Sequence, residues 1–345
     1  MKMEGANDVG EFSVPEVGFF EGTEKLLEVW FTSNVEDGLT NNNNNGDLRI
    51  IPREKLDQLL GIVDAEIISV DKNEFIDSYV LSESSMFISS NRFIIKTCGI
   101  TKLLFAVQPL INIVQRFTGM KLMNFFYSRR VYLKPENQIG IHQTFNSEVE
   151  YLQKIVPDGS PYIIGSKQTE QWYLFTSDNV SDFIESDDVT LEILMSDMDE
   201  TAMVEFTKLK NESSADVIKN SGIEKILPGS INDGCLFNPI GFSLNGLNKE
   251  AYYTIHVTPQ PSCSYVSFET NIKKESYDHI VNKVLDIFKP NKFIITLFST
   301  KGSQCGDADE VLKNVSLNNY ACADECSQQL KNYTLAYRAY CKQPN

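Results

Sequence analysis

The chain of 345 residues is poor in basic residues, in histidine and in long apolar runs. Its 31 Lys and Arg residues stand against 47 Asp and Glu residues, which gives a formal net charge of −16. Such an anionic field repels a phosphate backbone and an anionic membrane surface, so neither nucleic acid nor a membrane is expected as a partner. The charge suits a cationic small molecule, although acidity in most proteins serves solubility. No run approaches the roughly 18 consecutive apolar residues of a membrane-spanning helix.

Targeting signals and metal-binding patterns are also absent. Residues 1–18 hold four acidic residues and no apolar run, so we expect no secretory signal peptide there. The seven cysteines are an odd number scattered along the chain, and without a signal peptide they indicate reduced thiols and a cytoplasmic location. Cys322 and Cys326 have a CxxxC spacing with no histidine beside them, which is not a zinc pattern, so we expect no metal.

Several common catalytic motifs are missing as well. The chain has no GxxxxGK[ST] phosphate loop, no GxGxxG after a strand and no HExxH. The segment 241–246 comes near the GxSxG hydrolase elbow around Ser243, but its second glycine falls one residue late. With three histidines in the chain, a Ser-His-Asp triad has little choice of base.

Hydrophobic patterns indicate strands and hairpins interleaved with a few helices. In the first half, strand-like runs at 65–70, 75–82, 86–89 and 92–98 precede an apolar helical pattern over 101–117. In the second half, strands at 252–257 and 265–269 precede a helix over 276–288 and a strand at 292–298. Residues 25–31 fit a strand or one helical turn, and residues 54–60 fit a short helix. The repeated order predicts a duplicated α+β fold, with helices on one face of each antiparallel sheet.

One segment is of low complexity. Residues 38–47 contain five consecutive asparagines at 41–45 and offer nothing from which to build a core. We therefore expect a loop there.

Eight short blocks together carry more information than any single motif. They are FFEGTEKLLEVWF at 19–31, YVLSESSMF at 79–87, KTCG at 96–99, FFYSR at 125–129, LEILM at 191–195, FNPIGFSLNG at 237–246, TIHVTP at 254–259 and SYVSFE at 264–269. In this order, from about residue 19 to residue 300, they resemble the eukaryotic S-adenosylmethionine decarboxylase proenzymes.

The resemblance implies a single decarboxylase domain over 1–345, built as a four-layer α/β/β/α sandwich. Two antiparallel sheets face each other with helices outside and an internal duplication, in agreement with the pattern above. It also implies that the proenzyme cuts its own chain between Glu83 and Ser84. The products are a short (β) chain of residues 1–83 and a long (α) chain of residues 84–345, whose first residue becomes a pyruvoyl cofactor.

The resemblance assigns catalytic roles to four residues. Ser84 attacks the carbonyl group before it, Ser243 stabilises the oxyanion and His256 removes the α-proton in the elimination that follows. The pyruvoyl carbonyl then forms a Schiff base with S-adenosylmethionine and accepts the electrons released with CO2. Cys98 matches the donor that returns a proton to the α-carbon. From the residues alone, His256 would be a structural strand histidine and Cys98 a small buried hydrophobe.

The same resemblance identifies residues that bind the substrate. Phe20 and Phe237 match two aromatic residues that enclose the adenine, and Leu81 is assigned to the same site. Gln260 departs from the family, which usually has a glutamate that binds the ribose hydroxyls at this position. A neutral amide forms a weaker hydrogen bond than a carboxylate does, so we expect a weaker hold on the ribose.

Acidic residues are assigned to two places. Glu21 and Glu24 match active-site acids that steer a cationic substrate. A second group matches the site where some relatives bind putrescine as an activator, and it comprises Glu28, Lys96, Phe126, Asp188, Thr190, Glu192 and Glu269. Crowded carboxylates repel each other, and a dication relieves that repulsion.

Two functions remain open at this point. The first is an active decarboxylase that supplies the aminopropyl donor for spermidine and spermine, as a homodimer of cleaved protomers. The alternative is a catalytically silent partner subunit that regulates another decarboxylase. The chain keeps Glu83, Ser84, Cys98, Ser243 and His256, which favours the first.

Overall fold

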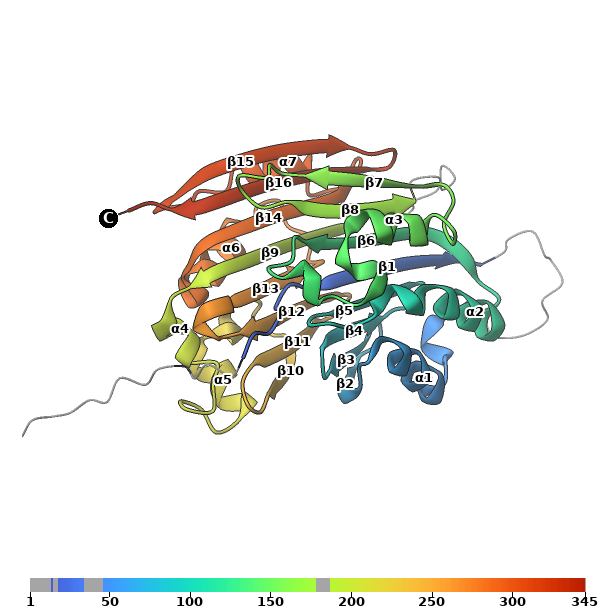
Figure 1. Ribbon diagram of the computed structural model, residues 1–345, viewed down its shortest axis with the longest axis horizontal. Coiled ribbons are helices and arrows are strands. Elements are labelled where there is room, and N and C mark those ends of the chain that lie inside the picture. The colour runs from blue at the N-terminus through green and yellow to red at the C-terminus, as the bar shows by residue number, and fades with distance from the viewer. Residues whose placement is uncertain (1–13, 15–17, 34–45, 178–186, 345) are drawn as a thin grey trace, which may run out of the picture.

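Two antiparallel sheets of eight strands each dominate the computed structural model (Figure 1), which describes residues 14, 18–33, 46–177 and 187–344. The N-terminal sheet runs in the order β2 (Ile67–Lys72), β3 (Asp77–Leu81), β4 (Ser84–Ile88), β5 (Arg92–Thr97), β1 (Lys25–Thr32), β6 (Lys121–Arg130), β8 (Trp172–Ser177) and β7 (Gly159–Ile164). The C-terminal sheet runs in the order β10 (Ile231–Leu236), β11 (Phe242–Asn248), β12 (Ala251–Thr258), β13 (Tyr265–Thr270), β9 (Val189–Met198), β14 (Pro290–Thr300), β16 (Tyr333–Lys342) and β15 (Tyr320–Gln329).

The two sheets have the same topology. Adding eight to each strand number of the N-terminal sheet gives the order of the C-terminal sheet. The predicted internal duplication is therefore confirmed at the level of topology.

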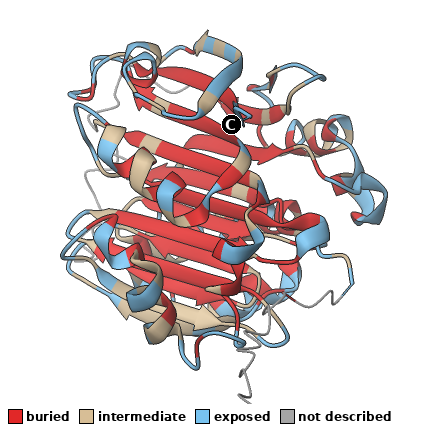
Figure 2. Ribbon diagram, turned by 90° about the vertical axis from the view of Figure 1, so that its left-hand side faces the viewer, coloured by how far each residue is buried: buried red, intermediate tan, exposed pale blue. Residues whose placement is uncertain are grey.

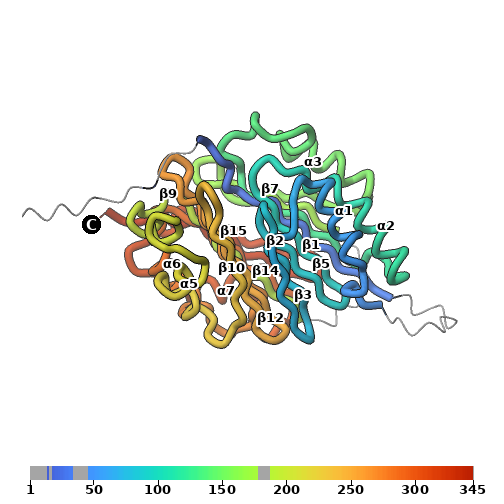
Figure 3. The backbone as a smooth tube through the Cα atoms, turned by 90° about the horizontal axis from the view of Figure 1, so that it is seen from below, coloured from blue at the N-terminus to red at the C-terminus, as the bar shows by residue number. Residues whose placement is uncertain are grey.

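Helices cover the outer face of each sheet (Figure 3). The N-terminal sheet carries α1 (Arg53–Val63), α2 (Val107–Thr118) and α3 (Phe145–Leu152), and the C-terminal half contributes α4 (Glu200–Val204), α5 (Ser214–Ser221), α6 (Asp278–Phe288) and α7 (Ala308–Lys313). The predicted α+β sandwich is thus confirmed. In the described part of the chain, no helix is long and apolar enough to span a membrane.

Helix α2 shows why these segments fold as they do. Val107, Leu110 and Val114 recur at helical spacing and are buried against the N-terminal sheet. The helix ends at Gly119, whose φ of 71° lies in the left-handed region that glycine adopts without a steric penalty. The pattern at 101–117 therefore predicted the helix correctly, with a 3-10 turn, Leu103–Ala106, before it.

Strand β1 is buried on both faces because it lies in the middle of its sheet, between β5 and β6. Leu27, Val29 and Phe31 pack under the helices, and Glu28 and Trp30 point to the space between the sheets. The alternative of a helical turn at 25–31 was wrong. Figure 2 shows that most strands are buried along nearly their whole length.

The space between the sheets combines an apolar core with buried charges. Rings such as Trp30, Phe126 and Trp172 form the apolar part. Glu28, Arg92, Lys96, Glu192 and Glu269 are buried beside them on facing strands. Burying an unpaired charge is costly, so the ion pairs among these residues determine which further charged groups this interior can bind. Of the predicted loop at 38–47, residues 38–45 lie outside the described residues.

Candidate active site

The hairpin between β3 and β4 carries the predicted cleavage bond. Leu81 pairs with Ser84 across it, so Ser82 and Glu83 form a two-residue turn. Ser84 is buried and has a φ of 139°, a conformation that non-glycine residues rarely adopt. Such strained residues cluster at functional sites, where the surrounding structure holds them in place.

The carbonyl oxygen of Glu83 accepts two hydrogen bonds from one residue. The backbone N–H of Cys98 donates at 2.9 Å and its thiol donates at 3.2 Å. Burial raises the pKa of the Cys98 thiol well above its ordinary value, and the nearby carboxylates of Glu83 and Glu24 add to this shift. The thiol therefore keeps its proton at neutral pH and can act as a donor.

A backbone corner after β5 aims Cys98 at this carbonyl. Gly99 has a φ of 65°, and a Cβ atom there would lie 3.3 Å from the ring of Phe20. The Gly99 carbonyl accepts hydrogen bonds from Lys25 Nζ at 3.0 Å and from Gln138 Nε2 at 3.2 Å. Two donors from other parts of the chain, Lys25 and Gln138, thus hold this corner in place.

The hydroxyl group of Ser84 donates a hydrogen bond of 2.6 Å to Glu24 Oε1. Burial alone would raise the pKa of Glu24, but Lys96 and His256, together with serine hydroxyls, lower it below its ordinary value. Lys96 Nζ lies 3.5 Å from the other carboxylate oxygen. Glu24 is therefore an ionised acceptor in contact with the serine that the resemblance makes the nucleophile.

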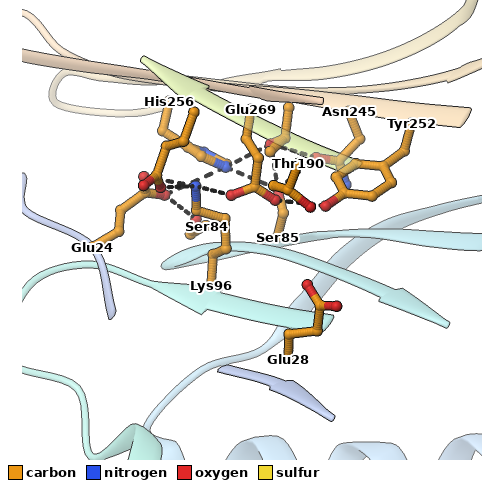
Figure 4. A network of polar contacts seen from close by, with 12 residues as sticks. Glu24, Glu28, Ser84, Ser85, Lys96, Thr190, Asn245, Tyr252, His256 and Glu269 are labelled. Carbon is orange, nitrogen blue, oxygen red and sulfur yellow. Dashed lines mark hydrogen bonds and ion pairs between the residues drawn. The ribbon is translucent and has the colours of Figure 1, made fainter. Parts of the chain in front are cut away.

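His256 lies directly opposite Ser243 in the pairing of β12 with β11. Its Nδ1 atom is 2.8 Å from Ser243 Oγ, and its Nε2 atom is 2.7 Å from Thr254 Oγ1 and 3.0 Å from Ser85 Oγ (Figure 4). Burial lowers the pKa of His256 from 6.5 to about 4, so the ring is neutral at physiological pH. A neutral imidazole in this position can accept a proton.

Three members of this network were not predicted from the sequence. Ser85 donates a hydrogen bond of 2.5 Å to Asn245 Oδ1, and Thr254 contacts the same atom at 3.1 Å. Asn245 in turn donates to the carbonyl oxygen of Tyr79 at 3.0 Å, which ties the two sheets together. A signal was available, because Asn245 and Thr254 each lie two residues from a predicted site residue on a strand and therefore share its face.

A cavity of about 360 Å³ joins the predicted residues. Its lining includes Phe20, Glu83, Ser84, Cys98, Phe237, Ser243, His256 and Gln260. The two phenylalanines that the resemblance assigns to adenine thus line the same space as the cleavage bond.

Three other predicted residues do not line this cavity. The side chain of Leu81 packs in the core between the N-terminal sheet and its helices. Glu21 is buried nearby, where its carboxylate accepts a hydrogen bond of 3.1 Å from the backbone N–H of Lys134. Glu24 contacts Ser84 from behind the cavity wall.

Gln260 is fully engaged by its own chain. Its Nε2 atom donates a hydrogen bond of 2.5 Å to the carbonyl oxygen of Gly18, and its Oε1 atom is 3.6 Å from the thiol of Cys263. The amide therefore anchors the segment that leads to Phe20. This contact could not be predicted from the difference between Gln and Glu alone.

The residues of the predicted putrescine site come together between the sheets, in two groups. Arg92 donates to Glu28 at 2.7 Å, to Asp188 at 3.2 Å and to Thr190 at 3.2 Å. This arginine was not predicted as part of the site. It stacks over Trp30, with 4.8 Å between the guanidinium carbon and the ring centroid.

Lys96 organises the second group. It lies 2.8 Å from Glu269 and 3.2 Å from Glu192, in addition to its contact with Glu24. Burial raises the pKa of Glu192 to about 7 despite the opposing charge of Lys96. Phe126 packs edge-on against two further rings, which closes the apolar side of this interior.

Comparisons with known proteins identify the family of the chain. A family model described as adenosylmethionine decarboxylase matches residues 17–341. The S-adenosylmethionine decarboxylase proenzyme of Xenopus laevis is 42% identical over 327 residues, covering 94% of this chain and 96% of the relative. The proenzyme of Saccharomyces cerevisiae is 33% identical, covering 92% of this chain and 91% of the relative.

A solved structure supports the fold independently. A Trypanosoma brucei AdoMetDC-delta26 monomer superimposes with a TM-score of 0.59 at 21% identity, covering 75% of this chain and 99% of that one. At this level of identity the likeness concerns the fold alone. The family model and the curated relatives, which span nearly the whole chain, show that this protein belongs to the adenosylmethionine decarboxylase family.

Proposed function

We propose that the chain is a self-processing S-adenosylmethionine decarboxylase whose cofactor is a pyruvoyl group made from Ser84. The observation that carries the proposal is the environment of the Glu83–Ser84 bond. Its carbonyl oxygen is held by two donors of Cys98, and the serine hydroxyl is held by an ionised carboxylate. These are the groups that an acyl shift onto a hydroxyl requires.

The first step forms an ester. Ser84 Oγ bonds to the carbonyl carbon of Glu83, its proton passes to Glu24, and the C–N bond of the peptide breaks as the nitrogen takes up a proton. The negative charge that develops on the carbonyl oxygen is stabilised by the N–H and thiol of Cys98. Ser243, which the resemblance makes the oxyanion donor, is hydrogen-bonded to His256 before the reaction.

The second step releases the short chain. Neutral His256 removes the α-proton of Ser84, the electron pair forms the Cα=Cβ double bond as the Cβ–Oγ bond breaks, and the short chain leaves with Glu83 as its terminal carboxylate. Hydration of the remaining dehydroalanine and loss of ammonia leave the keto group. The site fits this product, because Ser84 lines the cavity together with the two phenylalanines.

In turnover, the pyruvoyl carbonyl supplies an electron sink for the pair of electrons released with CO2. The side chains of the protein bind the substrate and supply the proton. Phe20 and Phe237 enclose the adenine, and the protonated thiol of Cys98 donates to the α-carbon. The product would serve as an aminopropyl donor for spermidine and spermine. We also propose that putrescine, a dication, activates the enzyme at the acids between the sheets and that cleaved protomers form a homodimer.

Intact mass spectrometry of the purified protein tests the central proposal. We expect two chains that meet between Glu83 and Ser84, the longer one blocked at its N-terminus by the keto group. A single uncut chain after long incubation would exclude self-processing and would favour a silent partner subunit.

The pH dependence of self-cleavage tests the role of His256. Because its pKa is about 4, the imidazole stays a free base down to mildly acidic pH and becomes protonated only below that value. We expect a cleavage rate that is flat from pH 7 to about pH 5 and halved near pH 4. The rate would be followed on denaturing gels with freshly synthesised protein. A midpoint near the ordinary histidine value of 6.5 would contradict the buried, neutral base.

The Gln260→Glu variant tests the anchor at Gly18. A carboxylate cannot donate to the Gly18 carbonyl and would bring two oxygens together, which displaces the segment leading to Phe20. We expect KM for S-adenosylmethionine to rise by about five- to tenfold, the cost of one lost hydrogen bond, with little change in kcat. Steady-state kinetics would measure both. A lower KM would instead mean that residue 260 reaches the ribose hydroxyls.

A further inference from the structure

The acids between the sheets are only partly neutralised. We call Glu24, Glu28, Asp188, Glu192 and Glu269 the acid cluster. Within the described residues, the lysine and arginine side chains that form ion pairs with these five are Arg92 and Lys96 alone. Burial and neighbouring carboxylates raise the pKa of two of these acids, Glu28 and Glu192, above the ordinary value. A further positive charge near the cluster would therefore be favourable.

Arg92 is a buried cation among the residues of the predicted putrescine site. Its guanidinium contacts Glu28, Asp188 and Thr190 at 2.7–3.2 Å, and these three residues belong to the predicted putrescine site. The residue is only 6% exposed, and among the described residues its Nε atom has no hydrogen-bond partner. An internal cation thus holds one end of the site.

Arg92 lies in the wall of one cavity and is hydrogen-bonded to residues that line another. The small cavity, of about 40 Å³, is lined by Glu28, Thr190 and Glu192 together with apolar residues such as Phe126. The large cavity, of about 660 Å³, has Arg92 and Asp188 in its wall. The side chain of Arg92 donates hydrogen bonds to Glu28, which lines the small cavity, and to Asp188, which lines the large one.

The small cavity does not hold a diamine as it stands. A water needs about 10–15 Å³ by this measure, so the cavity has space for about three waters, whereas a four-carbon diamine has six heavy atoms. The large cavity has the volume for such a molecule, and Arg92, which is hydrogen-bonded to Glu28, lies in its wall. A diamine can therefore reach Glu28 only if the guanidinium moves away from it.

We propose that Arg92 is a resident cation that competes with the diamine for Glu28 and Asp188, and that it sets the affinity of the chain for this effector. In the absence of diamine, Arg92 neutralises one end of the acid cluster. When a diamine enters from the large cavity, one ammonium group replaces the guanidinium, which swings out toward that cavity. The inference rests on the proposed activation by putrescine, and it adds the residue that opposes binding.

Calorimetric titration with 1,4-diaminobutane tests this role through affinity. The Arg92→Met variant keeps the bulk of the side chain but removes its charge. We expect Kd to fall by about tenfold or more, because a charge-assisted contact no longer has to be broken. The Arg92→Lys variant keeps one charge but cannot bridge two carboxylates, so its Kd should fall by about threefold. Damage to the fold alone would weaken binding and could not produce either change.

Lys273→Met is the matched control. Lys273 lines the same large cavity and lies 3.8 Å from Asp187, but its side chain is half-exposed. Because solvent screens this charge, its removal should change Kd by less than about twofold. A tenfold change in this control would mean that any positive charge near the cavity acts in the same way, and it would overturn the specific role of Arg92.

The outcomes separate this inference from the proposed activation. An unchanged or higher Kd in Arg92→Met overturns the inference, and if that variant does not fold, an unchanged or higher Kd in Arg92→Lys does so. If the wild type does not bind the diamine but Arg92→Met does, activation of the natural chain fails while the competition stands. If the wild type, Arg92→Met and Arg92→Lys bind equally, the proposed diamine site stands and the competition fails. If none of them binds, both fail.

Discussion

The Ser84→Ala variant is expected to remain a single chain of 345 residues and to have no decarboxylase activity. Alanine has no hydroxyl group to attack the carbonyl of Glu83, and it cannot become a keto group. The loss should therefore be complete rather than partial. Denaturing gels and a CO2-release assay with S-adenosylmethionine would measure the two effects.

Two further variants make this result specific. Ser82→Ala removes a hydroxyl from the same turn, where it accepts a hydrogen bond of 3.0 Å from the backbone N–H of Glu66. We expect normal cleavage in that variant. Ser84→Cys restores a nucleophile and should restore some cleavage through a thioester. Cleavage at the normal position in Ser84→Ala would exclude the proposed mechanism.

The Cys98→Ala variant should separate self-cleavage from turnover. Its backbone N–H still donates to the Glu83 carbonyl, so the acyl shift loses only the weaker of its two donors and should slow by about tenfold or less. Decarboxylation would lose its proposed proton donor, and such general acids contribute about 10²–10⁴ in rate. We therefore expect a chain that is cut at the normal position, at most about tenfold more slowly, but turns over at least about 100-fold more slowly.

The measurement uses fully matured protein, so that slow cleavage does not lower the concentration of active enzyme. Cys341→Ala is the control, because this thiol is exposed on β16, away from the cavity. Full activity in Cys98→Ala would show that another group returns the proton. A block in cleavage itself would show that the thiol, rather than the backbone N–H, is the essential oxyanion donor.

The hydrophobic pattern of the sequence predicted those strands and helices whose apolar residues are the ones buried in the structure. The strands of the first hairpins are short, closely spaced apolar runs, and the helix at 101–117 repeats with the helical period, so their positions were predicted to within a few residues. Strand β1 was ambiguous because both of its faces are buried, which removes the alternation that distinguishes a strand. The edge strands β10 and β15 gave no signal, since many of their residues are partly or fully exposed and polar.

At the site, the sequence identified several side chains, but contacts made by the backbone or by residues distant in the chain became visible only in the structure. The resemblance selected Ser84, Cys98, Ser243 and His256, and the structure gathers them around one cavity. The backbone N–H of Cys98 is absent from any sequence pattern, because every residue except proline has one. Arg92 was missed because its partners Asp188 and Thr190 lie on the facing side of the interior, almost a hundred residues away in the chain.

The place of β1 has a consequence for how the protein can be assembled. A cut between Glu83 and Ser84 would leave β1, β2 and β3 on the short fragment, while β5 and β6, which flank β1 on either side, would stay on the long fragment. The two fragments would then be interleaved within one sheet, held by hydrogen bonds along both edges of β1. Reassembly from separated fragments would be a bimolecular reaction, whereas the uncut chain folds as one molecule. Cleavage would therefore have to follow folding, and the cleaved enzyme, once denatured, should recover poorly on dilution.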